Sequence, residues 1–293
     1  MSKSEPILPN EETARLIGAS DAERIAYIQA DRWLGYDAAV AVLKELDDLL
    51  VHPRVLKMPC RIITADSDNG KTALLNRFVT KHSIAAEESD DPHVPVVRFD
   101  MPNYPDDGLL YSSILTGLFV AHRPNAPAEL LRTILVERIT ELKVRMLLAD
   151  EFHNISSYRD KLTREFLIAL KGLLNTLCIP LIAAGTQEAV AVIAADRQFP
   201  SRFQSLHLPT WRDYPLQGLR LLAGYGAWLP FRKPSELHMK EIAPAFLARC
   251  NLVGDFVSII KSSAELAIRD GSEAITRTHV DLAISERDKR RIK

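Results

Sequence analysis

The chain has 293 residues, 47% of them hydrophobic and 26% charged, which is ordinary for a globular protein of one large domain or two moderate ones. A formal net charge of −1 excludes a chain-wide attraction to nucleic acid, so any DNA binding depends on a local patch. Three cysteines exclude a disulfide framework, and neither a signal-peptide core nor a long apolar span is present, which predicts a cytoplasmic protein without a membrane segment.

Residues 1–20 are predicted to form a flexible arm. From residue 21 to about residue 51, apolar residues recur at helical spacing and are interrupted near Gly35, which predicts two helices that meet at Trp33 and Tyr36. These aromatic residues precede the first predicted strand, where an adenine ring would lie in a nucleotide-binding α/β domain. Stacking on a base and burial in the core are both compatible with their position.

A short apolar run at 60–65 precedes Gly70-Lys71-Thr72 and a helical segment, which is the order required for a phosphate-binding loop. Backbone N–H groups and the helix dipole at such a helix start attract an anion. Lys71 would contact the β- and γ-phosphates of ATP, and Thr72 would bind Mg²⁺. An ordinary helix N-terminus is the alternative.

The loop departs from the pattern G-x-x-x-x-G-K-[ST] at its first position and carries two carboxylates. Backbone amides form the phosphate cradle in such loops, so these carboxylates are expected to point outward, at some cost in nucleotide affinity. The predicted nucleotide-binding residues are Ala65, Asp66, Ser67, Asp68, Asn69, Gly70, Lys71 and Thr72, with Trp33 and Tyr36 as candidates for the base.

Strands and helices alternate over the next part of the chain. Predicted strands at 94–101, 144–151 and 179–186 alternate with predicted helices at 108–119, 128–143 and 162–177. With the strand at 60–65, this alternation predicts a parallel sheet with helices on both faces.

Beyond residue 213 only helical segments follow. The predicted organisation is therefore an α/β domain with N-terminal helices at 21–213, a small helical lid domain at 214–284 and a basic tail at 285–293.

Asp150 and Glu151 end the strand at 144–151, where open α/β sheets bind their ligands. Asp150 would bind Mg²⁺ through water, and Glu151 would polarise the attacking water. A solvated acidic turn is the alternative. Together with the Gly-Lys-Thr segment upstream, the doublet favours an enzyme that hydrolyses ATP.

Three further positions are candidates for contacts with the nucleotide. Thr186 follows the next strand and would touch the γ-phosphate or only cap the strand. Arg202, with Arg197 as second candidate, is expected to enter the site of a neighbouring subunit, and a surface salt bridge is the alternative. Val257 stands three residues after Gly254, where many such ATPases carry arginine, so that arginine is missing here.

These motifs, in this order, resemble the AAA+ transposition ATPases of the TniB/TnsC group. The resemblance extends from about Ala22 to Leu282 and depends on segments such as ADRWLGY, VRMLLADEFHNI and RQFPSRFQSLHLPTW. It implies an AAA+ P-loop fold with a small C-terminal helical lid, and ATP and Mg²⁺ as cofactors. It also implies that Thr186 is the first sensor and Arg202 the arginine finger.

The resemblance further implies a function. Such proteins use ATP to assemble as rings or filaments on double-stranded DNA and link a TniQ-like target-site protein to a DDE transposase of the TniA/TnsB type. Lys81, Tyr104 and Arg123 are the candidate DNA contacts. The acidic loop and Val257 leave an alternative open, namely a nucleotide-gated scaffold or STAND-like signalling ATPase that hydrolyses little ATP and binds no DNA.

Overall fold

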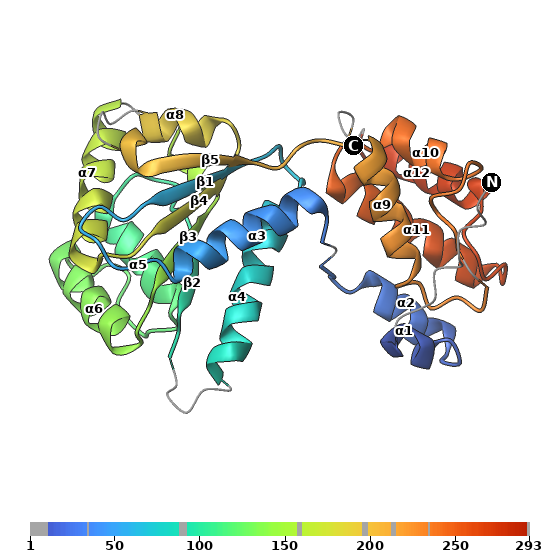
Figure 1. Cartoon of the computed structure of the whole chain (residues 1–293), viewed down its shortest axis with the longest axis horizontal. Coiled ribbons are helices and arrows are strands. Elements are labelled where there is room, and N and C mark those ends of the chain that lie inside the picture. Colours follow the sequence, from blue (N-terminus) through green and yellow to red (C-terminus); the bar gives the residue numbers. More distant parts are fainter. Residues whose placement is uncertain are drawn as a thin grey trace. The chain divides into compact units, whose positions relative to one another are not determined.

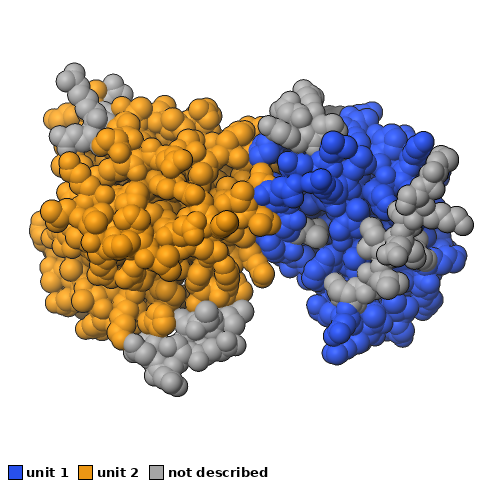
Figure 2. All heavy atoms as spheres, viewed as in Figure 1, with its two compact units in different colours: residues 1–37, 209–293 blue, residues 38–208 orange. Residues whose placement is uncertain are grey.

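The computed structural model describes residues 11–33, 35–87, 93–156, 160–194, 199–211, 215–233 and 235–291. By its internal contacts the chain divides into two compact units, which Figure 2 colours separately. Ala38–Leu208 form an α/β unit, and Met1–Asp37 together with Pro209–Lys293 form a helical unit.

The α/β unit contains a five-stranded sheet in the order β2-β3-β4-β1-β5, with all neighbouring strands parallel (Figure 1). All residues of β3 and β4 are buried, because a parallel sheet covered on both faces buries every side chain of an inner strand. The predicted parallel α/β class is confirmed, although the sequence does not predict β5. The strands are β1 (Cys60–Thr64), β2 (Val96–Asp100), β3 (Met146–Asp150), β4 (Leu181–Gly185) and β5 (Phe203–His207).

Helices cover both faces of this sheet. Leu147 and Ala149 of β3 lie in the core formed with α5, α6 and α7, so the alternation of side chains directs Leu148 to the opposite face. Figure 1 shows α3 and α4 on that side. The helices of the unit are α3 (Asp37–Leu50), α4 (Lys71–Glu87), α5 (Asp107–Gly117), α6 (Ala128–Glu141), α7 (Asp160–Leu177) and α8 (Glu188–Ala194), with 3₁₀ turns η1 (Phe152–Ile155) and η2 (Pro200–Arg202).

The helical unit combines both ends of the chain. Its amphipathic helix α11 packs against α12 and against the N-terminal helix α2. The helices are α1 (Glu11–Leu16), α2 (Asp21–Gln29), α9 (Pro215–Gly226), α10 (Ala243–Arg249), α11 (Val253–Arg269) and α12 (Arg277–Arg291). None of the helices in the described ranges is both long enough and apolar enough to cross a membrane.

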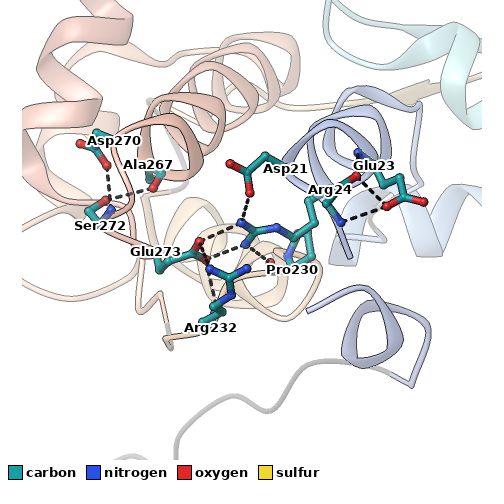
Figure 3. Close-up of polar contacts among 10 residues, drawn as sticks. Asp21, Glu23, Arg24, Pro230, Arg232, Ala267, Asp270, Ser272 and Glu273 are labelled. Carbon is teal, nitrogen blue, oxygen red and sulfur yellow. Dashed lines mark hydrogen bonds and ion pairs between the residues drawn. The ribbon is translucent and has the colours of Figure 1, made fainter. Parts of the chain in front are cut away.

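A buried charge cluster ties α2 to the segment between α11 and α12 (Figure 3). Arg24 donates two hydrogen bonds to Glu273, from Nη1 to Oε2 at 2.6 Å and from Nη2 to Oε1 at 2.8 Å. The backbone N–H of Arg232 donates to the same carboxylate. Since the Arg24 side chain is 0% exposed, this pairing helps to explain why α2 groups with the helical unit by contacts, whereas the sequence analysis places α2 at the start of a domain spanning 21–213.

The described residues nearest the two ends of the chain are helical where the sequence predicts a flexible arm and a tail. Residues 11–16 are helical, because Thr13 is buried and its hydroxyl shares a hydrogen bond of 2.9 Å with that of Tyr27. At the other end α12 continues to Arg291, because Arg287 pairs with the buried carboxylate of Asp255 on α11.

Candidate nucleotide-binding site

The loop between β1 and α4 turns where its backbone is left-handed, at Asp68 (φ 59°) and Gly70 (φ 81°). Ala65 is buried, and its N–H donates to the carbonyl of Gly185 on β4 at 3.2 Å. Because the loop has no positive φ at Ala65, an alanine is compatible with the backbone where the usual pattern has glycine.

The two loop carboxylates are exposed, as the sequence predicts for side chains that leave the cradle to backbone amides. Asp66 and Asp68, together with Ser67, lie on the surface, whereas Asn69 is buried. The side-chain amide of Asn69 donates to the carbonyl of Leu208 at 3.1 Å. The loop is thereby attached to the chain that leaves β5.

Lys71 folds back over the loop. Its Nζ donates to the carbonyls of Ala65 at 3.0 Å and Asp66 at 2.8 Å, and the residue is 6% exposed. Burial lowers the pKa of this amine, while the nearby carboxylates of Glu151 and Asp150 act in the opposite direction. The ammonium therefore lies inside the loop, in the position from which it would contact phosphate oxygens.

Thr72 and Asp150 meet across the start of α4. The Thr72 hydroxyl donates to Asp150 Oδ2 at 2.8 Å, and Asp150, at the end of β3, is 1% exposed. The backbone N–H of Glu151 donates to Asp150 Oδ1 at 3.0 Å. A hydroxyl and a carboxylate within hydrogen-bonding distance are hard oxygen ligands of the kind Mg²⁺ prefers, so these residues fit a nucleotide-bound magnesium ion.

Arg98 also reaches this carboxylate, a contact that the sequence does not predict. Its Nη2 donates to Asp150 Oδ2 at 2.9 Å and to Asp100 Oδ1 at 2.9 Å. The contact arises because β2 pairs with β3 with Asp100 beside Asp150. Arginine between apolar residues of a strand is the signal that the sequence offers, but its partner on β3 depends on the register of the two strands.

Glu151 leaves β3 in a left-handed conformation and keeps its side chain 44% exposed. His153 Nε2 lies 3.3 Å from Glu151 Oε2. Glycine is required at position 185, beside this turn. A Cβ there would lie 2.8 Å from Ala189 Cβ and 3.3 Å from the backbone nitrogen of His153. A partly exposed carboxylate oriented by histidine is suited to hold and polarise a water molecule.

Thr186 follows β4, which lies between the strand that ends at Asp150 and the strand that precedes the loop. Its hydroxyl is buried, and among the described residues it has no hydrogen-bond partner. A buried hydroxyl without a partner is costly unless something else satisfies it, and a phosphate or water oxygen would do so.

The other predicted site residues have contacts of their own, and one of them lies outside the described ranges. Arg202 belongs to η2 and donates from Nη2 to Asn175 Oδ1 at 2.7 Å, whereas Arg197 lies outside the described residues. Tyr36 is buried against Trp211, with ring centroids 4.9 Å apart, and burial raises its pKa to about 12. Trp33 is partly exposed.

The three candidate DNA contacts do not form one cluster. Lys81, on α4, pairs with Asp47 at 2.6 Å. Tyr104 is 44% exposed and lines a hollow of about 340 Å³ with the turn at 124–126, which directly follows the exposed Arg123. Tyr104 and Arg123 therefore share one region of the surface, and Lys81 belongs to another element.

Residues 24–213 match the family model described as bacterial TniB protein. Comparison with curated proteins gives no match. Solved structures similar to this chain include the Aeropyrum pernix ORC2 protein in ADPNP–ADP complexes (TM-score 0.61, 18% identity, 85% of this chain and 66% of that chain).

Two further similar structures are Cdc6p from Pyrobaculum aerophilum (TM-score 0.62, 18% identity, 89% of this chain and 70% of that chain) and the Aeropyrum pernix ORC1 protein in complex with DNA (TM-score 0.54, 14% identity, 89% and 69%). This chain spans 66–70% of the length of the three structures. At these identities the likeness shows the fold alone, and the fold is that of AAA+ P-loop ATPases.

Proposed function

Because the chain belongs to the TniB family, we propose that it is an ATP-dependent regulator of DNA transposition that assembles on double-stranded DNA. The observation that carries the ATPase assignment is the meeting of Thr72 with Asp150 beside a buried Lys71. Similar structures in complex with ADPNP, ADP or DNA support nucleotide and DNA binding by this fold.

Each residue of the site has a proposed task. Lys71 would bind phosphate oxygens, Thr72 would hold Mg²⁺, and Asp150 would hold the same ion through water. Glu151 accepts a proton from water at its exposed carboxylate, and His153 orients it. Thr186 donates its buried hydroxyl to the site. When bound, ATP with Mg²⁺ would supply the phosphoanhydride bond that is cleaved.

The proposal includes assembly and partners. Subunits form rings or filaments on DNA, with Arg202 entering the neighbouring site and with Lys81, Tyr104 and Arg123 as candidate phosphate contacts. The assembly connects a TniQ-like target-site protein to a DDE transposase, and hydrolysis is slow and stimulated by these partners. Such work on bacterial DNA belongs in the cytoplasm, which suits the three free cysteines.

A nucleotide-gated scaffold of the STAND-like type is the second candidate. The observation that favours it is Arg98 at Asp150, since a cation at the magnesium ligand opposes metal binding. Val257, at a position where arginine is common, is also consistent with weak coupling between nucleotide and helical unit. In this alternative the protein hydrolyses little ATP and binds no DNA.

Electron microscopy with double-stranded DNA distinguishes the two candidates. The chain is incubated with DNA, with and without a slowly hydrolysed ATP analogue. Rings or filaments are expected only with the analogue, and Lys71→Ala should abolish them because it removes the phosphate-binding ammonium. Nucleotide-bound protein that forms no assembly on DNA would contradict the transposition proposal and favour the scaffold.

A further inference from the structure

Both oxygens of the Asp150 carboxylate accept hydrogen bonds from the chain itself. Oδ1 accepts the N–H of Glu151, and Oδ2 accepts both the Thr72 hydroxyl and Arg98 Nη2. With 1% of the residue exposed, water screens this group little. Of the three donors only Arg98 carries a charge, so a resident cation neutralises the proposed magnesium ligand.

The same guanidinium nitrogen has a second carboxylate within reach. Arg98 Nη2 lies 2.9 Å from Asp100 Oδ1, and the Asp100 side chain is 69% exposed. Both residues belong to β2, and Asp100 lies beside Asp150 in the strand register. Arg98 can therefore give up Asp150 and keep an ion pair at the same edge of the sheet.

We propose that Arg98 is a positioning residue that competes with Mg²⁺ for Asp150. In the structure it contacts both Asp150 and Asp100, and on metal binding it would release Asp150 and keep its ion pair with Asp100. The positive charge of the guanidinium repels a divalent cation brought to Thr72 and Asp150. The inference rests on the magnesium site of the proposed function. It adds that Arg98 raises the Mg²⁺ concentration needed for nucleotide binding.

Two substitutions should change magnesium affinity in opposite directions. Arg98→Gln removes the competing charge and should lower the Mg²⁺ concentration for half-maximal nucleotide binding by about tenfold. Asp100→Asn removes the second carboxylate, so Arg98 remains on Asp150, and the same concentration should rise by about threefold or more. Arg98→Lys keeps the charge and should stay within about twofold of the unsubstituted chain.

Matched controls come from an exposed ion pair on α6. Arg138 Nη1 and Glu141 Oε2 are 2.5 Å apart, and their side chains are 47% and 57% exposed. Arg138→Gln and Glu141→Gln make the same changes of net charge as the two site variants. They should leave the Mg²⁺ dependence unchanged, because solvent screens charges on an exposed helix.

The test uses the full chain without DNA. Binding of a fluorescent ATP analogue is titrated with Mg²⁺, and Mn²⁺ binding is measured separately by electron paramagnetic resonance. Opposite shifts for Arg98→Gln and Asp100→Asn support the inference. If Arg98→Gln does not fold, the exposed Asp100→Asn variant still decides, and an unchanged Mg²⁺ dependence of that variant would overturn the competition.

The outcomes also separate this inference from the proposed function. Magnesium-dependent nucleotide binding that is equal in all folded variants would overturn the role of Arg98 and leave the proposed ATPase intact. An unsubstituted chain that binds no nucleotide at any Mg²⁺ concentration would overturn both.

Discussion

Glu151 has a backbone φ of 53°, which is uncommon for a residue with a side chain. The turn directs its carboxylate toward His153 Nε2, at 3.3 Å, while Asp150 stays buried. Strain of this kind is often found where a side chain must be aimed at a reacting group. Two adjacent carboxylates thus receive different environments, one suited to a metal and the other to water.

Glu151→Gln should therefore abolish turnover without abolishing binding. The amide keeps the shape of the side chain but cannot accept a proton, so the ATPase rate should fall by about 10²–10⁴-fold. Nucleotide affinity, measured with a fluorescent analogue, and nucleotide-dependent assembly on DNA should persist. His153→Gln should lower the rate by a smaller factor, because it affects only the orientation of Glu151. Unchanged turnover in Glu151→Gln would remove this residue from its proposed task.

At the scale of elements, the attachment of α2 to the helical unit depends on a pair separated by 249 positions in the sequence. Glu273→Gln leaves the fully buried Arg24 charge with only the exposed carboxylate of Asp21, at 2.7 Å, which should cost up to about 3 kcal/mol. Asp281→Asn, which breaks the exposed pair with Arg277 on α12, should cost no more than about 0.5 kcal/mol. Urea unfolding monitored by circular dichroism compares the two variants. An equal loss of unfolding free energy in the two variants would show that the buried pair stabilises the fold no more than the exposed one.

The same pair makes stability depend on pH. The hydrogen bonds from Arg24 hold the pKa of Glu273 below its ordinary value. A carboxyl with a lowered pKa in the folded state stabilises the fold above its unfolded pKa, about 4.3, and loses that contribution as the pH falls through the folded value. Acid should therefore destabilise the unsubstituted chain below about pH 4, and Glu273→Gln should lack this part of the loss.

How much the sequence predicts differs between elements for physical reasons. Four strands are predictable because each contains a run of apolar residues, which is continuous over most of the fully buried inner strands β3 and β4. The strand β5 is not, since its sequence FQSLH alternates with polar residues and exposes Gln204, Ser205 and His207. The contacts of Arg98 and Arg24 also escape prediction, because each depends on a partner brought near by the fold and not by local spacing.

The candidate phosphate loop, by contrast, has contacts that local sequence motifs do predict. Lys71, Thr72 and Asp150 come together as the motifs predict, because strand ends in a parallel sheet share one edge. The departure at Ala65 has no backbone consequence, since the turn is made at Asp68 and Gly70. Sequence motifs thus predict which side chains meet at the ends of the parallel strands. They do not predict long-range polar contacts such as those of Arg98 and Arg24.

At the scale of the whole molecule, the AAA+ fold and the proposed assembly give Arg202 a task outside its own subunit. In the chain itself Arg202 donates to the Asn175 amide at 2.7 Å, and an amide oxygen does not neutralise the guanidinium. The retained charge is available to stabilise developing phosphate charge in a neighbouring site. Arg202→Ala should therefore lower the ATPase rate by about 10³-fold or more, while leaving nucleotide binding by each subunit intact.

Mixing variants tests whether this arginine acts between subunits. Glu151→Gln, which keeps nucleotide-dependent assembly, has a defective catalytic carboxylate and an intact Arg202, whereas Arg202→Ala has the reverse. In an equal mixture about one interface in four joins an intact Glu151 to an intact arginine, so ATPase activity should return to about a quarter of the unsubstituted rate. The control mixes Arg202→Ala with a chain carrying both substitutions, and no activity should return. A mixture no more active than its separate components would contradict action in trans and leave Arg202 with only its contact to Asn175.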